Sequence, residues 1–244
     1  MKVYKFPTKQ GTGISAAEKG ANFIKQAINE KGSVNVILAT GASQFEMLNH
    51  LTSINGIEWR KVTCFHLDEY IALPESHGAS FRKYLSERFL EKVGSVKAFN
   101  FVNGSAANTA EECNRLEQLI KASPIDVAFV GIGENGHLAF NDPPADFETE
   151  KAYIIAALDM DCRKQQMGEG WFKTIEEVPK QAISMSIRQI LKSRHIIVTV
   201  PDKRKAEAVK NTIKCEVSNM HPSSILQTHP SCYIYLDNES GSLI

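Results

Sequence analysis

The segment from Gly131 to Pro144 holds the residues of this sequence that are best suited to chemistry. It reads GIGENGHLAFNDPP and places His137 five residues before Asp142 in a glycine-rich stretch. An imidazole beside a carboxylate can take up and return a proton near neutral pH, because the carboxylate tunes the basicity of the ring. Two alternatives are a surface histidine beside a turn aspartate and a His/Asp metal pair. No further metal ligand follows at a recognisable spacing, so we expect no metal.

The same segment contains the spacing G-x-G-x-x-G at Gly131, Gly133 and Gly136. This spacing is a dinucleotide-binding fingerprint when it joins a strand to a helix. Here Pro143 and Pro144 follow within eight residues of the last glycine, and prolines disfavour a regular helix. We therefore predict a flexible loop, with no dinucleotide and no other cofactor.

Two adjacent carboxylates, Asp68 and Glu69, follow the apolar run at 62–67. A general base is one use for such a pair, because burial or a neighbouring charge can tune one of the two pKa values. A solvated pair of loop acids, or a pair that caps the next turn, is the alternative.

The turn Thr40, Gly41, Ala42 and Ser43 follows another apolar run, at 34–39, and precedes a helical pattern. Small residues there let backbone N–H groups approach an anion, and a helix N-terminus favours negative charge. The turn is thus suited to a phosphate. A plain tight turn with Ser43 as N-cap is the alternative.

Three cations, Lys203, Arg204 and Lys205, open the helix predicted after the run at 195–200. An exposed cation in the first turn interacts unfavourably with the helix dipole and destabilises the helix by about 0.3–1 kcal/mol. A bound phosphate would reverse that penalty for one of them, whereas a solvated charged face would not. The spacing does not select which cation binds.

Predicted strands and predicted helices alternate along the chain, and these elements must position the four groups. This alternation predicts an α/β fold with a largely parallel sheet in a single domain, 1–244. In open sheets of this kind, ligands bind beyond the carboxyl ends of the strands, so the four groups should lie together. The predicted strands are 34–39, 62–67, 98–102, 126–132, 153–158, 182–186, 195–200 and 233–236, and the predicted helices are 15–30, 43–53, 79–92, 107–122 and 202–213.

Composition narrows the class of protein. Hydrophobic residues make up 43% of the chain, and 28 basic side chains balance 28 acidic ones. That balance does not favour a nucleic-acid or membrane-surface partner. No apolar run approaches the roughly 20 residues of a membrane span, and the N-terminus lacks the apolar core of a signal peptide. Five scattered cysteines without a C-x-x-C pair suit reduced thiols in a cytoplasmic protein.

Four of these segments together resemble the glucosamine-6-phosphate deaminase/isomerase family. They are LDEY at 67–70, GIGENGHLAFNDP at 131–143, TGAS at 40–43 and KA at 205–206, and matches run in the family's order from about residue 34 to about 236. The resemblance implies a Rossmann-like three-layer α/β/α sandwich, similar to ribose-5-phosphate isomerase. It also implies conversion of glucosamine 6-phosphate and water into fructose 6-phosphate and ammonia, without a redox cofactor.

The resemblance assigns roles to individual residues. It makes Asp68 the base for enolisation and His137 the group that assists ring opening. Asn135 falls on a polar position two before that histidine, and Asp142 on the acid that ends the loop. The family's phosphate contacts fall on the turn Thr40, Gly41, Ala42 and Ser43 and on Lys205.

The sequence departs from the family pattern at three places. Asp142 is one methylene shorter than the usual Glu, and Arg163 does not align with the family's phosphate-binding Arg. The segment 145–154, ADFETEKAYI, is acidic, whereas members activated by N-acetylglucosamine 6-phosphate carry a basic cluster there. We therefore predict no such allosteric site.

Other functions remain as alternatives. A 6-phosphogluconolactonase has a similar loop but typically continues toward SLFP rather than AFNDP, which favours the deaminase. A galactosamine-6-phosphate deaminase and a non-catalytic sugar-phosphate sensor are further options. The expected partner is a small amino-sugar phosphate, with no nucleic acid and no membrane, and the sequence leaves assembly into a homo-oligomer open.

Overall fold

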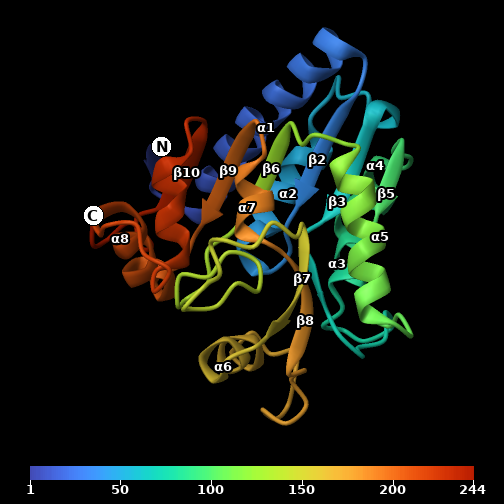
Figure 1. The fold of residues 1–244 in the computed structure, drawn as a ribbon. Helices are drawn as coiled ribbons and strands as arrows, with labels where there is room; N and C mark the ends of the chain where they lie inside the picture. The colour runs from blue at the N-terminus through green and yellow to red at the C-terminus, as the bar shows by residue number, and fades with distance from the viewer.

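A parallel sheet of seven strands forms the middle of the molecule (Figure 1). The computed structural model describes residues 1–244. Every neighbouring pair of strands in this sheet runs parallel, which confirms the predicted largely parallel sheet. Across the sheet the strands are β1 (Lys2–Phe6), β10 (Cys232–Asp237), β9 (His195–Val200), β6 (Val127–Val130), β2 (Val34–Leu38), β3 (Val62–His66) and β5 (Ala98–Asn100).

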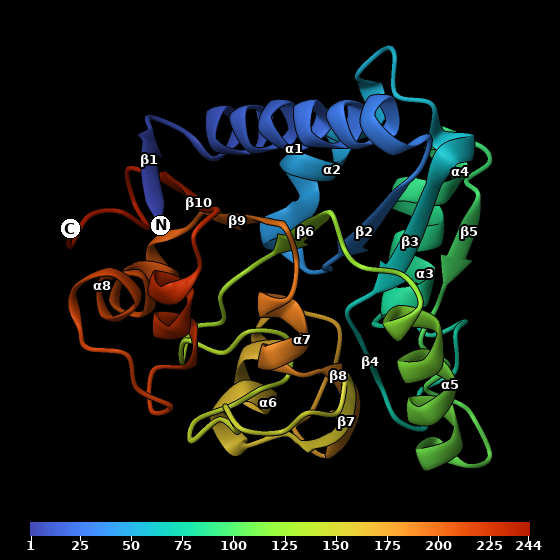
Figure 2. The same cartoon turned by 45° about the horizontal axis from the view of Figure 1, so that its top comes forward.

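Helices cover both faces of the sheet, so the predicted three-layer α/β/α sandwich is confirmed (Figure 2). Along β6, Phe129 packs in the core under one helical layer, whereas Ala128 and Val130 pack under the other. Burial on both faces explains why these strands are apolar almost throughout. The first layer holds α1 (Lys9–Lys31) and α2 (Phe45–Ser53), and the second holds α5 (Thr109–Lys121), α7 (Ile187–Leu191) and α8 (Ala206–Lys214).

A second, antiparallel sheet of three strands lies beyond the large one. Its order is β4 (Asp68–Tyr70), β8 (Gln181–Met185) and β7 (Tyr153–Ala157). Leu67 marks the branch point, because its N–H donates to Leu38 of β2 and its carbonyl accepts from Met185 of β8. The predicted strands at 153–158 and 182–186 therefore exist but do not join the parallel sheet.

Most predicted helices are present, with boundaries that differ. The helix expected at 15–30 begins at Lys9, because the Thr8 hydroxyl accepts the Gly11 N–H and caps it. The segment 79–92 is divided into α3 (Phe81–Leu85), the π-helical η3 (Ser86–Leu90) and α4 (Glu91–Val93). The helices expected at 43–53 and 202–213 open with the short 3-10 turns η1 (Ala42–Gln44) and η4 (Lys203–Lys205).

Several elements of the structure lie outside the strands and helices that the sequence predicts. They are β1, β4, α6 (Met160–Gly168), α7, and the 3-10 turns η2 (Trp59–Lys61) and η5 (Pro222–Thr228). Strand β1 is an edge strand whose side chains are mostly exposed, so it lacks the apolar run that marks the buried strands. Helix α6 has little apolar periodicity, since its buried residues are Cys162, Arg163 and Gln166.

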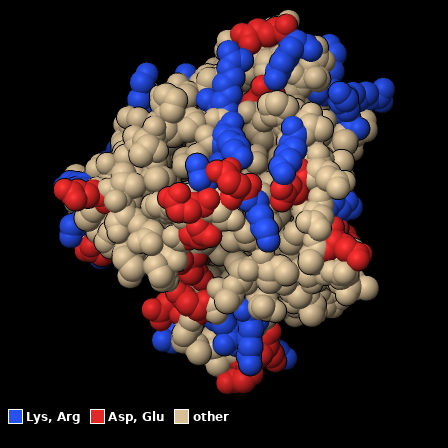
Figure 3. Space-filling model, in the orientation of Figure 1, with Lys and Arg blue, Asp and Glu red and all other residues tan.

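The segment from Gly131 to Pro144 forms turns and one isolated bridge and contains no helix, which confirms the prediction that no helix follows the glycines as a dinucleotide site requires. All five cysteines are free. None of the helices is both long and apolar enough to span a membrane. On the face drawn in Figure 3, basic and acidic side chains are interspersed.

Candidate active site

A cavity of about 260 Å³ opens where four strands of the large sheet end. Its walls come from the segments that follow β2, β3, β6 and β9, which are the four strand ends singled out in the sequence. Of the predicted residues, Asp68, His137 and Lys205 line it, and so does the whole turn from Thr40 to Ser43. Asn135 and Asp142 do not line it but contact His137 from behind.

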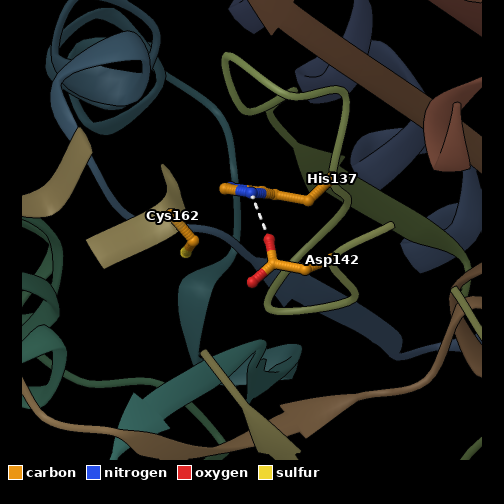
Figure 4. Close-up of side chains that lie close together, drawn as sticks. All are labelled: His137, Asp142 and Cys162. Atoms are coloured by element: carbon orange, nitrogen blue, oxygen red, sulfur yellow. Dashed lines mark hydrogen bonds and ion pairs between the residues drawn. The ribbon is translucent and has the colours of Figure 1, made fainter. Parts of the chain in front are cut away.

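His137 and Asp142 form a direct pair (Figure 4). Nδ1 of His137 lies 3.0 Å from Oδ1 of Asp142. Asn135 ties the loop together, because its amide donates to the same Oδ1 at 3.0 Å while its carbonyl oxygen accepts the His137 N–H at 3.1 Å. The backbone N–H of Asp159 donates to the other Asp142 oxygen. His137 is thus held both at Nδ1 of its ring and at its backbone N–H.

These contacts decide the charge of Asp142. Burial alone raises the pKa of its carboxyl, but the hydrogen bonds from His137, Asn135 and the Asp159 N–H outweigh burial and bring the pKa below its usual value. Asp142 is therefore ionised at neutral pH. An ionised partner stabilises the proton on the imidazole and orients the other ring nitrogen toward the cavity.

The local structure explains why glycine is needed at two positions of the loop. A Cβ on Gly133 would lie 2.3 Å from Cε1 of His137 and equally close to its Nε2, so only glycine lets the ring lie against the backbone there. Gly136 has a φ of +86°, a conformation that other residues rarely adopt. The glycines therefore shape the loop around His137 and do not cradle a nucleotide.

Asp68 and Glu69 point to different places. Asp68 lines the cavity and is only 6% exposed. Burial, helped by the neighbouring charge of Glu69, raises the pKa of Asp68 to about 8. A carboxylate with so high a pKa binds a proton strongly, which is the property of a general base that works near neutral pH.

Glu69 is fully buried away from the cavity, at the start of α3. Its carboxylate accepts from the Ser80 hydroxyl at 2.9 Å and from the backbone N–H of Phe81 at 3.2 Å and of Arg82 at 2.8 Å. Burial raises its pKa, and these hydrogen bonds oppose that rise. Glu69 therefore anchors the helix N-terminus, and of the two acids only Asp68 is placed for chemistry.

Lys205 is the one cation of the 203–205 turn that is buried, and it lines the cavity together with the exposed Arg204 and the 40–43 turn. Burial lowers its pKa, while the nearby Glu134 and Glu169 oppose that change. No carboxylate lies within ion-pair distance of its ammonium group, whereas Arg204 is paired with Asp202 and Glu134. The structure thus selects Lys205 from the three cations that the sequence left open.

Arg163 does not reach the cavity. Its guanidinium is buried and donates to the backbone carbonyls of Ile175 and Val178. It therefore holds the chain that follows α6.

Several cavity residues were missed by sequence reasoning. Lys9 reaches the cavity from the first turn of α1, Gln165 and Gln166 reach it from α6, and Glu169 reaches it from the position that follows α6. Lys9 could have been singled out from the sequence, because it is a cation in the first turn of a helix and no acid accompanies it there. The same reasoning drew attention to Lys205. The α6 residues could not be singled out in this way, because that helix lacks apolar periodicity.

The structure also adds a third side chain to the His/Asp pair. Cys162 of α6 lies beside it, and the ligand atoms of His137, Asp142 and Cys162 are all within 4.8 Å of one another (Figure 4). The sequence offered no such ligand, because Cys162 follows Asp142 by 20 residues and belongs to another element.

Comparison with known proteins gives consistent matches over almost the whole chain. The family model for glucosamine-6-phosphate isomerases and 6-phosphogluconolactonases matches residues 7–234. A glucosamine-6-phosphate deaminase of Thermoanaerobacter pseudethanolicus is 35% identical, over 93% of this chain and 90% of its own. One from Oenococcus oeni is 34% identical, over 95% of both chains.

Solved structures agree on the fold. A structure described as a monomeric glucosamine-6-phosphate deaminase has a TM-score of 0.90 and 30% identity, with all of both chains covered. A 6-phosphogluconolactonase of Shewanella baltica has a TM-score of 0.81 at 15% identity, over 97% of both chains. At that identity the second likeness concerns the fold alone.

Proposed function

This chain belongs to the family of glucosamine-6-phosphate isomerases and 6-phosphogluconolactonases, and we propose that within it the chain is a glucosamine-6-phosphate deaminase. The reaction takes glucosamine 6-phosphate and water to fructose 6-phosphate and ammonia, so it couples an isomerisation to the hydrolysis of a C–N bond. We propose one catalytic domain, 1–244, acting in the cytoplasm on amino-sugar phosphates. Its five free thiols suit a reducing compartment.

The first step opens the sugar ring, which moves a proton from O1 to the ring oxygen O5. His137 is the group for this step, because its ring borders the cavity and Nδ1 is held by an ionised Asp142. Nε2 then takes the proton from O1 and returns it to O5. Asn135 keeps the two residues in register, because it donates to the Asp142 carboxylate and accepts the backbone N–H of His137.

The second step takes a proton from C2 of the open-chain aldehyde and delivers one to C1. Asp68 is the base we assign to both transfers, since a single carboxylate over one face of the C1–C2 bond can serve both carbons. Asp68 is buried and its pKa is raised, so its carboxyl group holds the proton well between removal from C2 and delivery to C1. Isomerisation leaves an imine at C2, and water then adds to C2 and releases ammonia, leaving the ketone.

The phosphate lies at the opposite end of the cavity in this proposal. The turn Thr40, Gly41, Ala42 and Ser43 presents backbone N–H groups at the start of η1 and α2, and Lys205 supplies the buried charge. Lys9 adds a second cation at the cavity wall. In this proposal these groups bind the phosphate in place of Arg163, whose guanidinium donates to backbone carbonyls.

The observation that carries the proposal is that Asp68, Lys205 and His137, which is paired with Asp142, line one cavity. The test is release of ammonia from glucosamine 6-phosphate, galactosamine 6-phosphate and unphosphorylated glucosamine. We expect turnover of the first, with fructose 6-phosphate formed in equal amount. Release from galactosamine 6-phosphate alone would assign the other amino sugar, and no release from either phosphate would overturn the proposal.

The 6-phosphogluconolactonase activity is the second arm of the same assay. The loop ending Phe140-Asn141-Asp142 favours the deaminase, and Asn141 is used structurally, because its amide donates to the carbonyls of Leu138 and Met185. We expect no hydrolysis of 6-phosphogluconolactone above the spontaneous rate. Enzymatic hydrolysis without ammonia release would favour the lactonase instead.

A further inference from the structure

Cys162 lies against the proposed acid–base pair, and hydrogen bonds hold the segments that carry the three side chains (Figure 4). Asp159 caps α6 by accepting the Cys162 N–H at 2.6 Å, which fixes the thiol in the first turn of the helix. The Asp159 N–H in turn donates to Asp142 at 3.2 Å. The loop with His137 and the helix with Cys162 are therefore tied at the same point.

The donor set of this cluster is one imidazole nitrogen, one carboxylate oxygen and one sulfur, all within 4.8 Å of one another. Zn²⁺ takes these three kinds of ligand at about 2.0–2.3 Å, and sites with three protein ligands keep a fourth position open. A thiolate ligand disfavours Mg²⁺ and Ca²⁺, which prefer oxygen. His137 borders the cavity, whereas Asp142 and Cys162 do not line it, so the ion lies behind the imidazole ring as seen from the sugar site.

We propose that His137, Asp142 and Cys162 form a binding site for Zn²⁺ or a similar thiophilic divalent ion, and that this ion inhibits the enzyme. The ion takes the Nδ1 lone pair of His137, and the ring proton moves to Nε2. The Cys162 thiol gives its proton to solvent, so Zn²⁺ is balanced by one thiolate and one carboxylate. Nδ1 of His137 and Oδ1 of Asp142 are 3.0 Å apart, so a shift of a few tenths of an ångström brings both to about 2.0–2.2 Å from the ion.

Inhibition follows from the atoms that the ion occupies. Asp142 no longer stabilises a proton on His137, and Nε2 carries a proton that it cannot exchange through a change of tautomer. Ring opening needs both properties. A site that binds zinc at this point would therefore stop the enzyme without blocking the phosphate end of the cavity.

Metal binding is tested directly on metal-free protein, by calorimetric titration with Zn²⁺ and by absorbance with Co²⁺. We expect one tight equivalent of Zn²⁺ and a thiolate-to-cobalt band in the near ultraviolet. Cys162→Ala should weaken Zn²⁺ binding at least about tenfold and abolish the band. Cys162→Ser serves as a second variant that retains the packing volume.

The control is Cys215→Ala, which removes a half-exposed thiol outside the cluster. It should keep both the tight equivalent and the band. Unchanged binding in both Cys162 variants, or loss of the site in Cys215→Ala, would overturn the proposal.

The inhibitory part rests on the proposed deaminase function, and the two fail in different ways. Added Zn²⁺ should stop ammonia release by the wild-type protein and a chelator should restore it, whereas Cys162→Ala should need at least about tenfold more Zn²⁺. Tight binding without inhibition would overturn the inhibitory role alone. No ammonia release by the metal-free protein would count against the deaminase, and the binding titration would still decide the metal site.

Discussion

Asp142 reaches His137, with 3.0 Å between its Oδ1 and Nδ1 of the ring. The shorter acid therefore makes the contact that the sequence left in question. It can do so because the loop folds back over five residues and Asn135 bonds both partners. The pair is nearly buried, so its hydrogen bond is not screened by water.

Asp142→Asn should lower kcat/KM for glucosamine 6-phosphate by about 100-fold, because the neutral amide cannot stabilise a proton on His137. It should also lower the free energy of unfolding near pH 7. The pKa of Asp142 lies below its usual value, so its stabilising contribution is present at neutral pH and is lost as pH falls through that lowered pKa. Steady-state kinetics and urea unfolding at several pH values measure both effects. Asp161→Asn, an exposed acid of α6, is the control and should change neither. A fully active Asp142→Asn would remove the acid from the mechanism.

Gly133→Ala should lower kcat by about 100-fold and also lower the melting temperature, because the added methyl group overlaps the His137 ring and a displacement of about 1 Å is enough for such a loss of activity. The matched control is Gly168→Ala, where a Cβ has nothing within 4 Å. Kinetics and melting temperatures of the two variants test the prediction, and equal activity in both would contradict it.

Asp68→Asn should abolish exchange of the C2 proton with solvent deuterium while substrate binding remains, because the amide cannot accept the proton. NMR of the substrate and equilibrium binding measure the two properties. Exchange retained in the variant would refute the assignment of Asp68 as the base.

The same variant should be more stable than the wild type at alkaline pH. The folded pKa of Asp68, about 8, lies far above its ordinary value of 3.8. The folded protein therefore holds this proton while the unfolded chain releases it, and stability falls as pH rises between these values. Unfolding free energies at pH 5 and pH 8 should show the advantage of Asp68→Asn growing by at least about 2 kcal/mol. An advantage that does not change with pH would contradict the raised pKa.

Lys205→Met should raise KM for glucosamine 6-phosphate by about 10- to 100-fold with a smaller effect on kcat, because a charge-assisted contact to phosphate is lost. The exposed Lys203 provides the control, and Lys203→Met should behave as the wild type. Equal KM values for the two variants would place the phosphate elsewhere.

N-acetylglucosamine 6-phosphate should leave the kinetics hyperbolic and unchanged. The segment 145–154 is acidic, and the cations that approach it are already paired, Arg188 with Glu148 and Glu150 and Lys192 with Glu150. Lys151 is the single cation of the segment itself, so the segment lacks a basic cluster that could bind the phosphate of an effector. Sigmoidal kinetics that become hyperbolic when this compound is added would contradict the prediction.

Much of the framework was readable from local sequence. Buried parallel strands are apolar on both faces, so β2, β6 and β9 could be recognised from their composition alone. The prolines after Gly136 excluded a helix, because that effect depends only on neighbouring residues. The four strand ends could be expected to meet, since a parallel sheet brings its carboxyl ends to one edge.

The tertiary structure decided which side chains line the cavity. Whether Asp68 or Glu69 faces the cavity depends on the pairing of β4 with β8, and whether Lys203 or Lys205 does depends on how η4 packs. Both choices are set by contacts between segments far apart in the chain. The same holds for Cys162, which reaches the loop pair only because Asp159 ties α6 to Asp142. Residue types and strand ends are local properties that a sequence contains, whereas the direction of a side chain is settled by the packing of distant elements.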